Sequence, residues 1–111
     1  MIPVEHYVLL SSVLFVIGGI GFLVRRNVIV TLMSIEVMLN AANLALVAFN
    51  RSRLHHAVEQ SAPGASHTGQ VFAFFIIAAE AAEVAVGLAI VLSLYRLRRT
   101  VRSDEADLLK N

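Results

Sequence analysis

Apolar residues in this chain form three long runs, and polar residues fall between the runs and at the two ends. The runs cover about Tyr7–Val24, Val28–Phe49 and Val71–Tyr95. A helix needs ~20 residues to cross a hydrocarbon core of ~30 Å, and each run is close to or beyond that length. The pattern predicts an all-α membrane protein with three transmembrane helices, organised as a single domain over residues 1–111.

The segments between the runs differ in length. Residues 25–27 form a connection so short that the first two helices must pair as an antiparallel hairpin. Residues 50–70 are polar and predict an outer loop, and residues 96–111 predict a cytoplasmic tail. Gly18, Gly19 and Gly21 lie inside the first run, where small residues favour close helix packing.

The composition supports a membrane protein. Hydrophobic residues make up 58% of the chain and charged residues only 15%, which is unlike an ordinary soluble domain. The absence of cysteine excludes disulfides and thiolate ligands for iron–sulfur clusters within this chain. Nucleotide-binding glycine motifs and basic, aromatic-rich nucleic-acid motifs are missing, so no nucleic-acid partner is expected. The acidic N-terminus does not resemble a signal peptide.

Basic residues are distributed unequally between the two predicted sides. The first connection has two and the tail has five, giving seven on one side: Arg25, Arg26, Arg96, Arg98, Arg99, Arg102 and Lys110. The other side has only Arg51 and Arg53. Because basic residues favour the cytoplasmic side, the N-terminus is predicted outside and the C-terminus in the cytoplasm.

Three carboxylates interrupt the apolar runs: Glu36, Glu80 and Glu83. An ionised side chain at the centre of a bilayer costs at least ~2.5–3.5 kcal/mol, and such residues commonly mark proton or ion pathways. At ~1.5 Å per residue, Glu36 lies ~12–14 Å and Glu83 ~17 Å from the cytoplasmic ends of their helices. These similar depths on antiparallel helices predict a proton relay of Glu36 and Glu83, with Glu80 ~5 Å further outward.

Two asparagines extend the polar face of the second helix. Glu36, Asn40 and Asn43 lie within about 60° of one another at ~100° per residue. Such a polar stripe must face another helix or water. We expect Asn40 to support the relay and Asn43 to act as a hydrogen-bonding contact between helices. On the third helix, the alanine ridge at 81, 85 and 89 is expected to allow close helix contact.

The motifs of the first two runs resemble a known family. The stretch GGIGFLVRRN at 18–27, running into SIEVMLNA at 34–41, is similar to the small three-helix subunit K of proton-pumping NADH:quinone oxidoreductase, respiratory complex I. The stretch AAEVAVGLA at 81–89 resembles the third-helix motif of that family. Both motifs occur in the expected order and in a chain of the expected length.

The resemblance implies a non-redox subunit of a translocase in the bacterial inner membrane. NADH, FMN, iron–sulfur clusters and quinone would belong to other subunits, leaving no cofactor in this chain. The expected partners are the lipid bilayer and neighbouring membrane subunits, both antiporter-like and quinone-proximal. By motif position, Glu36 and Glu83 would link quinone reduction to proton translocation, while Arg25 and Arg26 would hold loop geometry and interfaces.

Two features depart from the family pattern, and other functions remain as alternatives. The 50–70 loop is longer than expected, and Glu80 is an additional acid without a family role. His55, His56 and His67 in that loop lack a carboxylate or cysteine partner at a fixed spacing, so no metal site is predicted.

The alternative functions are the small subunit of a multisubunit cation/proton antiporter or of a membrane-bound hydrogenase. A multidrug exporter fits less well, because aliphatic and small residues surround Glu36 and Glu83.

Overall fold

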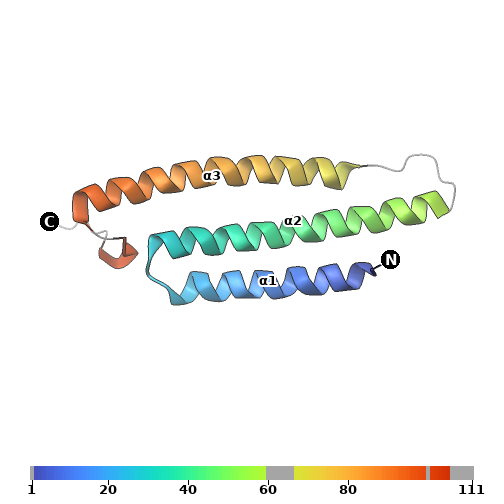
Figure 1. Cartoon of the computed structure of the whole chain (residues 1–111), viewed down its shortest axis with the longest axis horizontal. Coiled ribbons are helices and arrows are strands. Elements are labelled where there is room, and N and C mark those ends of the chain that lie inside the picture. The colour runs from blue at the N-terminus through green and yellow to red at the C-terminus, as the bar shows by residue number, and fades with distance from the viewer. Residues whose placement is uncertain (1, 60–66, 100, 106–111) are drawn as a thin grey trace.

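Three long helices form the molecule (Figure 1). The computed structural model describes residues 2–59, 67–99 and 101–105. Helix α1 spans Val4–Val24, α2 spans Val28–Glu59 and α3 spans Thr68–Arg98, followed by the short 3-10 helix η1 at Ser103–Glu105. Helix α2 lies between α1 and α3, and the molecule measures 67 × 23 × 20 Å. All three helices are long and apolar enough to cross a membrane, which confirms the prediction of an all-α chain with three such helices.

Helix α2 is longer than its apolar run. It continues past Phe49 to Glu59, and α3 begins at Thr68, so much of the predicted 50–70 loop is helical. Residues 51–59 contain no Gly or Pro, and Glu59 forms helical contacts with His55 and His56 that favour continuation. Residues 60–66 and the tail residues 106–111 lie outside the described part of the chain.

Helices α1 and α2 approach each other closely at two glycines. A Cβ atom on Gly18 would lie 2.6 Å from Met38 Cγ and 2.9 Å from the Ser34 backbone oxygen. A Cβ atom on Gly21 would lie 2.7 Å from Ser34 Oγ. The predicted packing role is therefore confirmed for Gly18 and Gly21. For Gly19 it stays a prediction, because nothing lies within 4 Å of a Cβ atom placed there among the residues that the structure describes.

Helices α2 and α3 approach each other closely at a glycine of α3. Gly87 on α3 is buried against Leu32 on α2, with a virtual Cβ only 2.8 Å from Leu32 Cδ2. The alanine ridge at 81, 85 and 89 is exposed instead, because it lies on another side of α3. The expected close contact of this ridge with another helix is not made by the described residues of this chain and stays a prediction.

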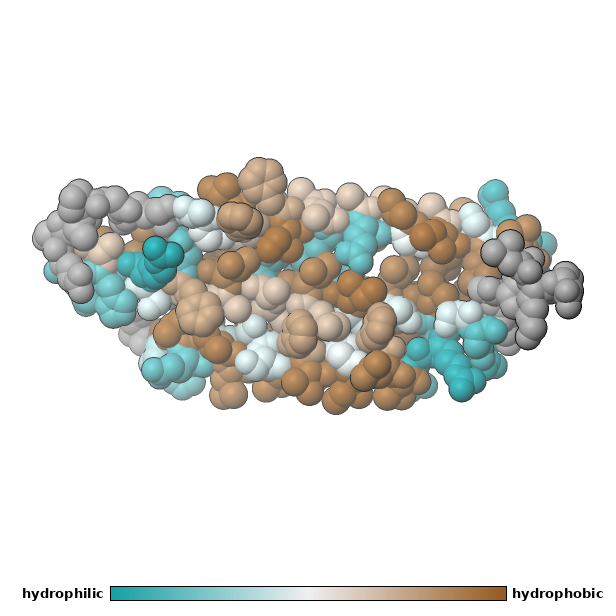
Figure 2. Space-filling model, turned by 180° about the vertical axis from the view of Figure 1, so that it is seen from behind, coloured by the Kyte–Doolittle hydropathy of each residue, from teal (hydrophilic) through white to brown (hydrophobic). Residues whose placement is uncertain are grey.

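The core inside this chain is small. Its buried hydrophobic residues are Ala41, Ala48, Ala73, Val91 and Leu94. Most large apolar side chains point outward, and Figure 2 shows hydrophobic residues across the middle of one face with hydrophilic residues gathered at both ends. A surface of this kind suits lipid and neighbouring transmembrane helices rather than water.

The tail folds back onto the turn between α1 and α2. Asn27 begins α2 as a cap, because its Oδ1 accepts hydrogen bonds from the backbone N–H groups of Ile29 and Val30. The Val28 N–H donates to the Val101 carbonyl at 2.8 Å, and the Ser103 N–H donates to the Arg26 carbonyl at 2.8 Å. The segment after α3 is thus joined to the α1–α2 turn by backbone hydrogen bonds.

Asp104 reinforces this contact through two arginines. Its carboxylate lies 3.2 Å from Arg26 Nη1 and 2.9 Å from Arg102 Nη2. Partial desolvation acts to raise the pKa of Asp104. The hydrogen bond from Arg102 and the charges of Arg102 and Arg26 outweigh it, so the pKa lies below its usual range. The ionised form therefore favours the folded tail.

We expect the tail contact to weaken in acid. A carboxyl group with a depressed pKa stabilises the fold above its unfolded-state pKa, and this contribution is lost as pH falls through the folded-state value. Hydrogen exchange corrected for intrinsic rates should show Ser103 N–H protection falling in acid. Asp104→Asn should lower the protection of the Ser103 N–H already at neutral pH. Glu59→Gln, at the opposite end of the molecule, is the control. Unchanged protection in Asp104→Asn at neutral pH would exclude a role for this ion pair.

Candidate functional site

One line of polar residues on α2 faces α3. Glu36, Asn43 and Asn50 follow one another at steps of seven residues. Because seven residues are close to two helical turns, the three side chains share one face of α2. Asn43 and Asn50 are buried, and Asn50 Oδ1 accepts a hydrogen bond from the Gly69 N–H at 3.2 Å. This polar line is the α2 side of the candidate site.

The matching line on α3 places Glu80 against α2. Its buried members, again at steps of seven residues, are Ala73, Glu80, Gly87 and Leu94. Only 7% of Glu80 is exposed, and its Oε1 accepts a hydrogen bond from Asn43 Nδ2 at 3.3 Å. Glu80 is thus the carboxylate at the centre of the α2–α3 contact, whereas Glu83 is partly exposed beside it.

The two glutamates that carry the predicted relay share one groove. Glu36 from α2 and Glu83 from α3 both line an apolar groove of about 400 Å³ between the helices. The remaining lining residues are Ile29, Leu32, Met33, Val37, Val84 and Leu88. Two protonatable groups from separate helices therefore meet in one largely apolar space. Glu36 Oε1 is buried and has no hydrogen-bond partner among the described residues.

The two asparagines of the polar stripe have different roles. Asn40 is exposed, and its Nδ2 donates to the backbone carbonyl of Glu36 at 2.9 Å rather than to a carboxyl group. Asn43 is the residue that contacts a membrane carboxylate. The angular spacing from Glu36 places both asparagines on one side of α2. The seven-residue spacing of Glu36, Asn43 and Asn50 is the sequence signal that distinguishes Asn43 from Asn40.

The arginines of the α1–α2 turn lie away from these carboxylates. Both precede α2, and Glu36 lies about two helical turns inside that helix. The carbonyl and the guanidinium of Arg26 both contact the tail, at Ser103 and Asp104. Arg25 is exposed beside it, and its N–H donates to the Gly21 carbonyl at the end of α1.

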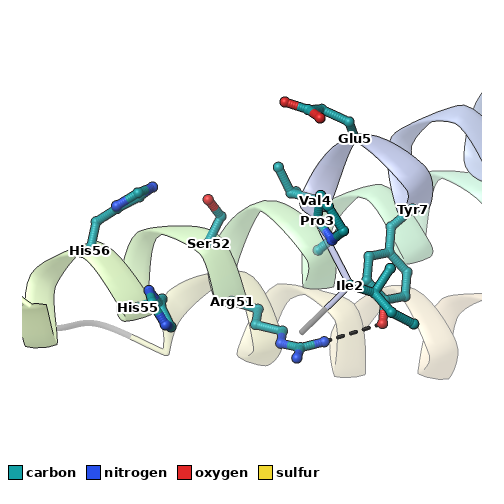
Figure 3. A pocket seen from close by; sticks show the side chains of 10 residues that line it. Ile2, Pro3, Val4, Glu5, Tyr7, Arg51, Ser52, His55 and His56 are labelled. Atoms are coloured by element: carbon teal, nitrogen blue, oxygen red, sulfur yellow. Dashed lines mark hydrogen bonds between the residues drawn. The ribbon is translucent and has the colours of Figure 1, made fainter.

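A second pocket lies at the opposite end of the molecule, where α1 begins and α2 extends (Figure 3). Its volume is about 210 Å³. Arg51 reaches across to α1 and donates a hydrogen bond to the Tyr7 hydroxyl at 3.2 Å, while Glu5 points away from it. The Arg51 guanidinium carbon also lies 5.8 Å from the centre of the Tyr7 ring. These contacts fix the ends of α1 and α2 relative to each other.

Two residues that line this pocket, His55 and His56, have a carboxylate neighbour in Glu59. His55 Nδ1 lies 3.3 Å from Glu59 Oε1, and His56 Nδ1 lies 3.6 Å from Glu59 Oε2. One ligand atom from each residue falls within 4.8 Å of the others, which is a spacing that could hold a metal ion. His67 is not in this group and contacts Gln70 at 3.0 Å. All three grouped side chains are exposed, and their spacing is that of ordinary neighbours on a helix.

Comparison with known proteins identifies the family to which this chain belongs. The family described as NADH-ubiquinone/plastoquinone oxidoreductase chain 4L matches residues 6–111. Subunit K of NADH-quinone oxidoreductase from Sorangium cellulosum (strain So ce56) is 57% identical over 110 residues, covering 99% of this chain and 97% of the relative. The chain belongs to the subunit K family of NADH-quinone oxidoreductase.

Two further relatives bearing the subunit K name cover the chain equally well. The protein from Akkermansia muciniphila is 48% identical over 111 residues, which is 100% of both chains. The protein from Acidobacterium capsulatum is 46% identical over 112 residues, covering 99% of each. The chain is thus a membrane-arm subunit of an NADH-quinone oxidoreductase, as its motifs predict. This result favours the oxidoreductase over the antiporter and hydrogenase alternatives.

Family membership also defines the setting of the chain. It is a small multi-pass membrane protein that associates with other subunits of the same enzyme complex. The function of the three glutamates must therefore be sought within that larger assembly.

Proposed function

We propose that Glu36 and Glu83, together with Glu80, form a proton relay that couples quinone reduction to proton translocation. The observation that carries this proposal is the shared groove, in which Glu36 from α2 and Glu83 from α3 face the same apolar space. Glu80 lies one turn from Glu83 on α3 and contacts α2 through Asn43. The three carboxyl groups thus lie along one α2–α3 interface.

The physical properties of the groove favour proton exchange. Removing a carboxyl group from water disfavours its charged form, and a neighbouring carboxylate acts in the same direction. The apolar segments 28–50 and 68–95 contain no Lys or Arg, so a counter-charge would come from a neighbouring subunit.

The chain would take part in the reaction without redox chemistry of its own. We propose that NADH, FMN, the iron–sulfur clusters and quinone are bound by other subunits. The chain has no cysteine for cluster ligation and no glycine-rich dinucleotide motif, which supports this division. Its contribution would be to hold and pass protons inside the membrane.

The surroundings that fit this role are two kinds of membrane subunit, one antiporter-like and one near the quinone, in the bacterial inner membrane. Exposed apolar surface on all three helices offers the area for such contacts. Asn40 would support the relay by its hydrogen bond to the Glu36 backbone carbonyl. Arg25 and Arg26 would hold the α1–α2 turn, consistent with the contacts of Arg26 to the tail.

The orientation can be tested by labelling single cysteines. The basic residues at the 25–26 turn and in the tail favour a cytoplasmic location for that end, with the N-terminus outside. His67→Cys should react with a membrane-impermeant thiol reagent added to intact cells, and Ser103→Cys should react only after permeabilisation. The native chain has no cysteine and provides the blank. The reverse pattern would show that the chain is inserted the other way.

The relay itself is tested by replacing Glu36 and Glu83 with glutamine in the assembled complex and measuring proton pumping. Glutamine preserves the size and polarity of the side chain but has no dissociable carboxyl proton. A loss of pumping with assembly retained would support the proposal.

A further inference from the structure

The contact between Asn43 and Glu80 is a buried polar pair in the middle of the α2–α3 interface. Only 8% of Asn43 and 7% of Glu80 is exposed. Asn43 Nδ2 donates to Glu80 Oε1 at 3.3 Å. An amide N–H can donate to a carboxyl oxygen whether the acid is ionised or neutral, so this bond can persist as Glu80 gains or loses a proton.

The other end of the same amide is not satisfied within the described residues. Asn43 Oδ1 is buried and meets no donor among them, and the same is true of Glu36 Oε1. Buried acceptors without a donor are rare and costly. Both atoms belong to the polar line of α2 that faces α3. Asn43 Oδ1 belongs to the amide that contacts Glu80, so it is suited to receiving a hydrogen bond from a protonated acid or from water.

We propose that Asn43 is a positioning residue for Glu80. Its amide would hold the Glu80 carboxyl group at the α2–α3 interface, where that group can keep a proton beside Glu83. A proton that leaves the Glu80 carboxyl would be taken up by an ionised Glu83, and the Asn43 N–H would then stabilise the Glu80 carboxylate. This inference rests on the proposed relay and adds Asn43 to it.

The position of Glu80 on α3 supports this role. Glu80 shares its buried line with Ala73 and Gly87, whose small side chains allow the helices to approach. A carboxyl group at such a position has few orientations available, so its oxygen atoms are directed by their neighbours. Asn43 is the hydrogen-bonding neighbour that the described residues provide. A merely structural contact would join the helices but would not influence the proton held by Glu80.

Infrared difference spectroscopy of the assembled, reconstituted complex tests the inference, because a protonated carboxyl group has its own C=O stretching band. Glu80→Gln should remove one such band from a pH-induced difference spectrum. Asn43→Ala and the similarly sized Asn43→Leu should shift that band to higher frequency, since they remove the hydrogen bond to Glu80. Ser12→Ala is the matched control, because its exposed hydroxyl on α1 donates to the Val8 backbone carbonyl instead, and it should leave the Glu80 band in place.

Two results would overturn the inference. One is a difference spectrum in which Glu80→Gln removes no band, because Glu80 would then hold no exchangeable proton. The other is an unmoved Glu80 band in an assembled Asn43 variant, or an equal shift in Ser12→Ala. Leucine preserves bulk at the interface and provides a second chance of assembly if alanine does not. Loss of pumping on replacement of Glu36 and Glu83 could still occur in either case, so the two proposals fail separately.

Discussion

Replacing Glu36 and Glu83 together by glutamine should give a complex that assembles but has lost most of its NADH-driven proton pumping. Positioned acid–base groups contribute ~10²–10⁴-fold to proton transfer, so we expect a decrease on the order of tenfold or more. Both side chains line one groove between α2 and α3. Glutamine should keep the packing there, and the defect should therefore appear in proton movement rather than in assembly.

The measurement uses purified complex in liposomes, with a pH-sensitive dye inside and quinone reduction followed in parallel. Glu36→Asp should retain more pumping than Glu36→Gln, because aspartate shortens the reach while keeping the acid. Glu5→Gln is a suitable control, since Glu5 is exposed near the start of α1 and away from the groove. Wild-type pumping by the assembled double variant would rule out a relay through these two residues.

The second large effect is expected at the α1–α2 interface. Gly18→Leu should reduce the amount of assembled subunit, because even the Cβ atom would lie 2.6 Å from Met38 Cγ and 2.9 Å from the Ser34 backbone oxygen. A backbone atom cannot move aside as a side chain can. Overpacking of this kind typically costs ~1–3 kcal/mol. A small core made largely of alanine has little capacity to absorb the change.

Gly19→Leu provides the matched control one residue away. Nothing in the described part of the chain lies within 4 Å of a Cβ atom placed at Gly19, so leucine there should be accepted by the helix pair. Native gel electrophoresis and thermal release of the subunit from the complex would compare the two variants. Equal amounts of stable complex would contradict the close packing at Gly18, whereas equal loss would place a neighbouring subunit against Gly19.

The sequence predicts the three helices well because hydrophobic length dominates in a membrane protein. A run of ~20 apolar residues has few alternatives to a spanning helix. Hydrophobic length predicts less where the chain leaves the apolar run, as the continuation of α2 to Glu59 shows. There the helix is favoured by local propensity and side-chain pairs rather than by hydrophobic length, so its end cannot be placed from hydropathy.

Glu36, Glu80 and Glu83 are identified by the sequence alone, because a carboxylate inside an apolar run is chemically out of place. Their neighbours are decided only by the tertiary structure. Helical spacing gives the direction of a side chain on its own helix but not the rotation of the partner helix. It therefore could not show that Glu36 and Glu83 share a groove while Glu80 meets Asn43.

The tail illustrates the same limit. Asn27 before an apolar run predicts the start of a helix, since a capping side chain acts on its own next residues. The hydrogen bonds from Val28 to Val101 and from Ser103 to Arg26 join segments that are far apart in the sequence. The sequence of this protein determined its helices and its buried acids through local and solvent-driven preferences. The tertiary structure determined which groups touch, because contacts between helices depend on how all three pack at once.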